Sequence, residues 1–272
     1  MESEIKSFTW KRNLDYIKEN LYILKKRTIE YKTNTYISLF EQFWYYLIYF
    51  LFFYVLAENF SLVVSWNLGD FIIFALLIDF IHVFAGLFMW KEKFHLTMLN
   101  GNLNNYLIRP IKPKLAYYYS NLSVGALIFM LTNIIVFPFV IYYFKIELNN
   151  LFLSFIIFLL ILLVYILSYF FSRSINFFSF GLASFFETIR EIGNITIGKN
   201  YPFSFFEKFN FNFLLLGFPI FFTSSLLIPL LRSYEIIHFE FQIKVLFSLI
   251  FFFATSGYLL WHYGLKKYEA FG

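Results

Sequence analysis

The segment Trp90–Lys114, WKEKFHLTMLNGNLNNYLIRPIKPK, is the longest polar interval between two strongly apolar stretches of the chain. Its single acid, Glu92, stands among five basic residues, namely Lys91, Lys93, Arg109, Lys112 and Lys114. A basic loop between two membrane spans lies on the cytoplasmic side of the membrane, according to the positive-inside rule. The segment therefore predicts a membrane protein whose spans are arranged around a cytoplasmic loop.

The same segment is too apolar to be a solvated linker. Its apolar side chains are those of Phe94, Leu96, Met98, Leu99, Leu103, Leu107 and Ile108. Pro110 and Pro113 follow, and proline ends a helix because it has no backbone N–H to donate. We expect a short amphipathic helix at the cytoplasmic surface, closed by a rigid Arg-Pro turn, through which a membrane subunit holds a soluble partner.

The composition indicates the class of protein. Of the 272 residues, 60% are hydrophobic and 14% are charged. Several windows of about 20 residues are almost free of charge, and this is the length that a helix needs to cross a bilayer. We therefore predict an all-α polytopic membrane protein with a single transmembrane domain over residues 1–272. The chain has no cysteine, which excludes disulfides, thiol nucleophiles and cysteine metal sites.

The distribution of charge predicts the topology. The net charge of +5 does not indicate a nucleic-acid partner, because the basic residues collect beside the predicted spans. All but six of the 22 Lys and Arg lie in four segments that we place in the cytoplasm, namely 1–41, 91–114, 173 and 266–267. The exceptions are Lys145, Arg190, Lys199, Lys208, Arg232 and Lys244. This bias predicts that both termini are cytoplasmic and that the number of spans is even.

Residues 1–35 predict an amphipathic helix that lies in the membrane interface. An apolar stripe recurs at spacings of four and three, formed by Trp10, Leu14, Ile17, Leu21, Leu24, Thr28 and Tyr31. The opposite face carries Lys11, Lys18, Glu19, Lys25 and Lys26. Such a helix places its stripe among the acyl chains and its lysines among anionic headgroups. An ordinary soluble helix is the alternative, and the span that follows directly makes it the less favoured one.

Residues 36–272 predict a bundle of six spans. Five are regular: Ile37–Ala57, Phe71–Trp90, Leu122–Tyr143, Leu151–Phe171 and Ile243–Tyr263. We expect Ser174–Ile197 to be the fifth span in chain order, although it holds three charges, those of Glu187, Arg190 and Glu191. Asn200–Leu231 is apolar but interrupted by Gly and Pro, so we expect a re-entrant helical hairpin that dips in from outside. If the interrupted run is instead a full span and Ser174–Ile197 lies flat, the count is still six.

Ionisable residues in the predicted spans are candidates for a translocation path. Asp79 and His82 lie three residues apart, and such groups usually face the bundle interior or a wet cavity. They could form a proton or ion-coupling site, a metal pair or part of a translocation path. A polar pair satisfied by neighbouring helices, with Arg190 as one candidate partner, is the favoured interpretation, because two ligands are too few to indicate a metal. Glu187 and Arg190 have helical spacing, so they either line the outer mouth of a path or neutralise one another.

The sequence shows no catalytic, cofactor or metal site. Gly193–Lys199 matches the GxxxxGK part of a phosphate-binding loop, but Asn200 stands where the magnesium-binding hydroxyl is needed and no strand precedes the match. A membrane-embedded enzyme would need a catalytic cluster near one interface, which the sequence does not show. A secondary transporter would more often show internal repeats, so only Asp79 and His82 favour that alternative.

Three motifs occur in a characteristic order. Gly101–Pro110 reads G-x-L-x-x-x-L-x-R-P, Tyr201 and Pro202 precede the interrupted run, and Gly264–Gly272 is a basic G-L-x-x-Y terminus. In this order they resemble the permease subunits of ATP-binding-cassette exporters of the ABC-2 class, particularly the branch related to daunorubicin-resistance-type permeases. Together with the number of spans, the resemblance covers nearly the whole chain.

The resemblance implies a transport subunit and not an enzyme. It also implies that this subunit pairs with a second copy or a paralogue. A separate ATPase subunit would bind the ATP and magnesium. We expect such a protein in a bacterial or archaeal cell membrane. The polar loop would form the coupling contact with the ATPase, and its candidate residues are Glu92, Phe94, Leu99, Leu103, Leu107, Arg109 and Pro110. The outer hairpin would cap the translocation path.

Overall fold

The computed structural model describes residues 2–30, 32–60, 66–89, 94–109, 111–120, 122, 124–190, 200–203, 215, 218–236 and 238–268. All regular structure in these ranges is helical. The chain forms two compact units. Unit 1 comprises residues 1–44, 83–131 and 269–272, and unit 2 comprises residues 45–82 and 132–268.

Among the described residues, five helices are long and apolar enough to cross a membrane. They are α2 (Lys32–Phe60), α3 (Leu68–Met89), α7 (Val124–Tyr143), α8 (Leu151–Ile175) and α13 (Phe239–Lys267). A helix rises 1.5 Å per residue, so even the 20 residues of α7 extend about 30 Å, the thickness of the hydrocarbon core. The five regular spans predicted from the sequence are confirmed as long apolar helices.

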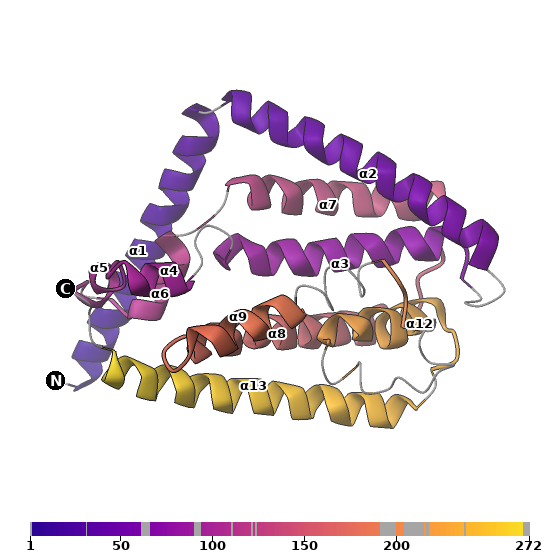
Figure 1. Cartoon of the computed structure of the whole chain (residues 1–272). Helices are drawn as coiled ribbons and strands as arrows, with labels where there is room; N and C mark the ends of the chain where they lie inside the picture. Colours follow the sequence, from indigo (N-terminus) through magenta and orange to yellow (C-terminus); the bar gives the residue numbers. More distant parts are fainter. Residues whose placement is uncertain are drawn as a thin grey trace. The chain divides into compact units, whose positions relative to one another are not determined.

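Within unit 2, α8 and α13 pack side by side (Figure 1). Trp261 of α13 lies against Phe170 and Phe177, with ring centroids 5.6 and 5.3 Å away. Gly264 permits the close approach, because a Cβ there would lie 2.5 Å from the Cβ of Phe177. Gly257, about two helical turns earlier, also permits a close approach, because an added Cβ would lie 3.0 Å from a ring atom of Phe170. Small residues at such contacts are typical of helix pairs in membranes.

The predicted fifth span is not confirmed. Ser174 and Ile175 belong to the end of α8, and residues 176–178 form a turn. The next helix, α9 (Phe180–Arg190), has 11 residues, which at 1.5 Å per residue extend only about 16 Å. The α8 helix ends where Asn176 donates from its Nδ2 atom to the carbonyl of Arg173, 3.2 Å away. Residues 191–197 of the predicted span lie outside the described residues.

The interrupted run before the last span contains a short composite helix. A 3-10 turn (η2, Pro219–Phe221), a π-helical turn (η3, Thr223–Leu227) and α12 (Ile228–Arg232) follow one another. Pro229 explains the wide turn, because it cannot donate to a carbonyl one α-helical turn earlier. Almost all side chains of this helix are buried. The re-entrant hairpin itself stays a prediction, since residues 204–214 lie outside the described part of the chain.

Unit 1 is built around α1 (Glu2–Glu30). The helices α4 (Phe94–Leu99), α5 (Asn104–Leu107) and α6 (Pro113–Ser120) gather beside it (Figure 1). Leu24 of α1 joins a buried cluster with Val83, Leu122 and Ala126. Leu14 and Leu21, from the same predicted apolar stripe, are exposed. The predicted N-terminal helix is thus confirmed as a helix, and its place in the membrane interface stays a prediction.

Candidate functional site

The predicted coupling loop folds into two short helices before Pro110 instead of the one expected. The break is at Gly101, whose φ of 68° lies in the left-handed region that glycine adopts at no steric cost. The chain then turns, and the Leu103 amide donates to the Thr97 carbonyl across the turn, 3.1 Å away. Pro113 does not end a helix but begins α6, a position where its missing N–H costs nothing.

The predicted coupling residues differ in their environments. Phe94 and Leu103 are 1% and 0% exposed, so their side chains contact the chain itself, and their predicted contact with a partner stays a prediction. Leu107 is half-buried and Arg109 is exposed. Leu99 lies in α4, but its side chain is outside the described residues, as are Glu92 and Pro110.

Aromatic packing explains why Phe94 is buried. Its ring lies edge-on to Tyr117 of α6, with the centroids 5.1 Å apart. Tyr106 of α5 contacts the same Tyr117 ring at 5.4 Å. Edge-to-face pairs of this kind hold short helices together that could not be stable alone. Phe94, Met98 and Leu103 therefore belong to the core of the loop.

Arg109 is held at the surface of unit 1 by neutral partners. Its Nη1 donates to the Tyr16 hydroxyl at 2.7 Å, and its Nε donates to the Asn105 carbonyl at 3.0 Å. The Tyr16 hydroxyl donates in turn to the Ala116 carbonyl at 3.2 Å. The guanidinium carbon also lies 5.2 Å from the centre of the Tyr106 ring. Tyr16 thus connects α1, the loop and α6, a role that nothing in the sequence indicated.

Next to this arginine, Ile108 is 82% exposed, and Leu96 is 46% exposed. Ile108 and Arg109, which follow one another in the chain, form what we call the Ile108 surface. An exposed isoleucine beside a positioned guanidinium is the kind of composition that protein interfaces favour at their centre. The sequence marks Ile108 as one of several apolar residues of the loop and does not distinguish it as a contact residue.

The intramembrane candidates Asp79 and His82 have separate tyrosine partners in unit 2. Asp79 is buried, and both of its carboxylate oxygens lie 2.8 Å from the Tyr45 hydroxyl. His82 Nδ1 and the Tyr165 hydroxyl form a hydrogen bond of 2.9 Å. These contacts agree with a polar pair satisfied by neighbouring helices. No group of three or more potential metal ligands occurs among the described residues.

Of the other predicted path residues, Glu187 is half-buried in α9. Arg190 ends that helix, and its side chain lies outside the described residues, as does the whole of Glu191. The contact suggested between Arg190 and Asp79 is therefore not tested. A role of Glu187 and Arg190 at the outer mouth of a path stays a prediction.

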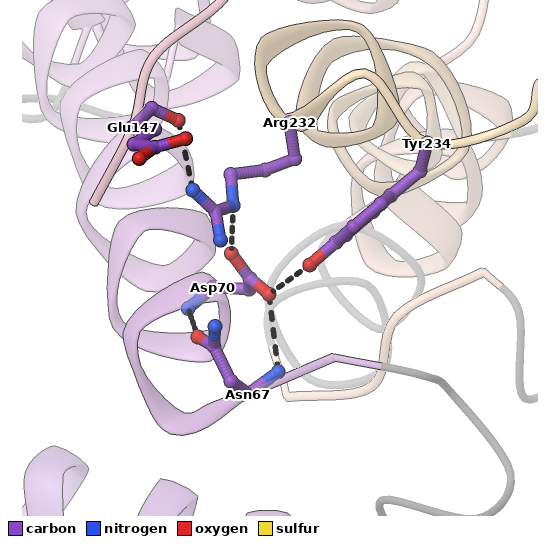
Figure 2. A network of polar contacts seen from close by, with 5 residues as sticks. All are labelled: Asn67, Asp70, Glu147, Arg232 and Tyr234. Carbon is purple, nitrogen blue, oxygen red and sulfur yellow. Dashed lines mark hydrogen bonds and ion pairs between the residues drawn. The ribbon is translucent and has the colours of Figure 1, made fainter.

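A polar network that the sequence did not reveal lies in unit 2 (Figure 2). We call it the Asp70 clasp. It consists of Asn67, Asp70, Glu147, Arg232 and Tyr234. Arg232 Nε and Asp70 Oδ1 form an ion pair of 2.7 Å, and the Tyr234 hydroxyl donates to Asp70 Oδ2 at 2.8 Å. The other end of the guanidinium donates from Nη1 to the Glu147 carbonyl at 2.8 Å.

Asp70 is positioned by the start of α3. The Asn67 amide donates to Asp70 Oδ2 at 3.0 Å, and the Asp70 amide donates to Asn67 Oδ1 at 2.9 Å. This reciprocal pattern is a capping box, and the amide end of the helix also stabilises the negative charge. The spacing Asn-x-x-Asp was the one signal in the sequence that could have revealed this part of the clasp.

The clasp connects three segments. The α7–α8 connection approaches α3 so closely that a Cβ on Gly69 would lie 2.9 Å from Cδ1 of Ile146. The Asn149 amide donates to the Leu231 carbonyl at the end of α12, 2.7 Å away. Burial and the hydrogen bond to Asp70 raise the pKa of Tyr234 above its usual value. The arrangement can hold the composite helix in place; it contains nothing that would carry out a reaction.

The comparisons with known proteins concern most of the chain. A family model described as "ABC-2 family transporter protein" matches residues 43–272. No curated protein and no solved structure matches the chain. The matched region contains the loop helices α4 to α6, the Asp70 clasp and four of the five long apolar helices in full.

Proposed function

Since this chain belongs to the ABC-2 family of transporter proteins and is a multi-pass membrane component of such a transporter, we propose that it exports its substrate with energy from a separate ATPase subunit. The observation that carries the proposal is the family match over residues 43–272, which includes the loop segment. The family match argues against the two alternative functions, those of a secondary transporter and of a membrane-embedded enzyme. We also propose that the chain belongs to the daunorubicin-resistance-type branch of the class.

We propose that the Ile108 surface is where the ATPase binds. Ile108 is apolar and 82% exposed, so covering it would remove apolar area from water. Arg109 is already oriented by Tyr16 and Asn105, which lowers the conformational entropy that binding would cost. Phe94 and Leu103 would act from inside, by keeping the loop rigid.

The arrangement in the membrane follows from the charge distribution. We propose that both termini and the Ile108 surface are cytoplasmic, because the basic residues collect in those segments. An even number of spans then requires one more crossing than the five long helices, contributed by the region from α9 to α12. Two copies, or this chain and a paralogue, would pair around a two-fold axis, the commonest closed arrangement.

The ATP and magnesium would be held by the partner. Within Gly193–Lys199 this chain has the glycines and the lysine of a phosphate-binding loop, but Asn200 cannot supply the hydroxyl that binds magnesium. The chain's own contribution to a transport cycle is therefore mechanical. Movement of the ATPase would reach the spans through the loop, whose short helices are tied to α1 by Tyr16.

Affinity purification of the tagged chain from its native membranes tests this proposal. We expect an ABC-type ATPase to copurify and magnesium-dependent ATP hydrolysis to appear only in its presence. In the variant Ile108→Asp, association should weaken by about 2 kcal/mol or more, roughly thirtyfold, as for a central interface residue. Asn102→Asp is the matched control, because it adds the same charge at an exposed position of the same loop.

Two outcomes would contradict the proposal in different ways. ATP hydrolysis by the isolated chain would show that the ATPase is not a separate subunit. Equal association of the Ile108→Asp and Asn102→Asp variants with the ATPase would leave the exporter standing but place the contact elsewhere on the chain.

A further inference from the structure

A cavity of about 210 Å³, open on one side, lies between α3, α7 and α8 in unit 2. Six apolar side chains line it, those of Leu76, Leu77, Phe80, Ile134, Phe137 and Phe158. The rings of Phe80 and Phe158 contact each other there in a tilted arrangement, with their centroids 5.7 Å apart. An apolar cavity of about 150 Å³ is known to hold benzene. This one therefore has room for a benzene ring with a small substituent.

One polar side chain also lines the cavity, that of Asn133 in the middle of α7. It is 2% exposed. Its Oδ1 accepts a hydrogen bond of 2.8 Å from the Tyr46 hydroxyl. The other polar atom of the side-chain amide is the donor Nδ2. Nδ2 has no hydrogen-bond partner among the residues that the structure describes. A buried donor without an acceptor is unfavourable, and the hydrocarbon of a bilayer supplies no acceptor.

We propose that this cavity binds a small apolar molecule that carries one hydrogen-bond acceptor, such as an aryl ketone or an aryl ester. The ring would lie between Phe80 and Phe137, and the acceptor would pair with Nδ2 of Asn133. A lipid acyl chain fits the apolar walls equally well, but its methylene groups leave the amide unpaired. The unpaired amide thus favours a ligand with an acceptor over an acyl chain.

The inference goes beyond the proposed export function and does not depend on it, since binding is measured on the full chain without an ATPase. The probes are 4-fluoroacetophenone and 4-fluoro-α-methylstyrene, which have nearly the same shape. In the second, a C=CH₂ group replaces the C=O group, so that the acceptor is lost. Fluorine NMR of each probe in lipid nanodiscs, with empty nanodiscs to subtract partitioning, gives a dissociation constant.

We expect saturable binding of the ketone to the wild-type chain, about fivefold tighter than that of the styrene, as is typical of one net hydrogen bond. Asn133→Leu keeps the size of the side chain and removes the donor. It should weaken ketone binding about fivefold and leave styrene binding unchanged. Leu77→Trp fills the cavity and should abolish the binding of both probes.

The comparison of the two probes on the wild-type chain needs no variant, so the test holds even if Asn133→Leu does not fold. Equal affinity for the two probes, or ketone binding that is unchanged in Asn133→Leu, would overturn the proposal and indicate a groove for acyl chains. Absence of saturable binding of either probe would overturn it as well.

Discussion

Each of the two units contains an arginine that contacts a tyrosine, and the two arginines have opposite environments. In unit 2, Arg232 pairs with Asp70, a carboxylate that is 0% exposed. In unit 1, Arg109 is exposed, and the partners described above are a hydroxyl, a carbonyl and aromatic rings. Removing Arg232 leaves a buried charge without its counterion, whereas removing Arg109 leaves only groups that water can reach.

This difference separates a permanent contact from an adjustable one. A buried ion pair is strongly destabilised when one partner is lost, so it suits a contact that must persist through a transport cycle. An exposed guanidinium held by neutral groups can exchange those groups for a partner's at little cost in free energy. We therefore expect the Asp70 clasp to remain closed, and the Ile108 surface to be remodelled when an ATPase binds.

The largest effect is expected for Arg232→Met. The variant leaves Asp70 charged and buried, which should lower the free energy of unfolding by about 3–5 kcal/mol. The double variant Asp70→Asn, Arg232→Met should recover a large part of the loss, because no buried charge then remains. Chemical unfolding in detergent micelles, followed by tryptophan fluorescence, measures both values.

Lys244→Met is the control for this experiment. Lys244 also forms an ion pair, with Glu240 at 3.8 Å, but both side chains are largely exposed. An exposed pair one helical turn apart contributes little, so the free energy of unfolding should change by less than about 0.5 kcal/mol. A similar loss in Lys244→Met and Arg232→Met would show that burial does not distinguish the clasp.

A smaller effect is expected for Arg109→Met. It removes the hydrogen bonds to Tyr16 and Asn105 without burying a charge, so the loss should be about 1 kcal/mol or less. Tyr16→Phe should have a similar effect, since it removes the same contact from the other side. The same unfolding experiment gives both numbers, and a loss of about 3 kcal/mol or more would abolish the contrast between the two arginines.

The five long helices could be predicted because a membrane span must be about 20 residues long and nearly free of charge, and both properties are visible in one segment. Ser174–Ile197 is long enough for the same rule but holds three charges, and the structure does not confirm it as a span. There α8 ends at Ile175, and the Asn176 side chain donates back to the Arg173 carbonyl. Composition alone does not contain that information.

The sites were less predictable than the spans because they depend on contacts between distant residues. Tyr234 and Asp70 are 164 positions apart, and only the capping pair Asn67 and Asp70 is local enough to see in the sequence. The charge and the prolines of the loop indicate its position in the chain, but they do not distinguish the buried Phe94 and Leu103 from the exposed Ile108. An apolar residue in a polar segment indicates that its side chain is covered, but not whether the chain itself or a partner covers it.

The smallest effect concerns the pH dependence of the clasp. Burial, together with the hydrogen bond to Asp70, raises the pKa of Tyr234 in the folded chain above the value of about 10 that it has when unfolded. The folded state then holds the phenolic proton more tightly, so the stabilisation is complete below pH 10. It is lost as the pH rises from about 10 through the higher pKa of the folded chain. Tyr234→Phe has no such proton, and its stability should fall less over this alkaline range than that of the wild type. Unfolding curves recorded between pH 8 and pH 11.5 compare the two chains; if their stabilities fall in parallel, the Tyr234 hydroxyl is not what joins this tyrosine to Asp70.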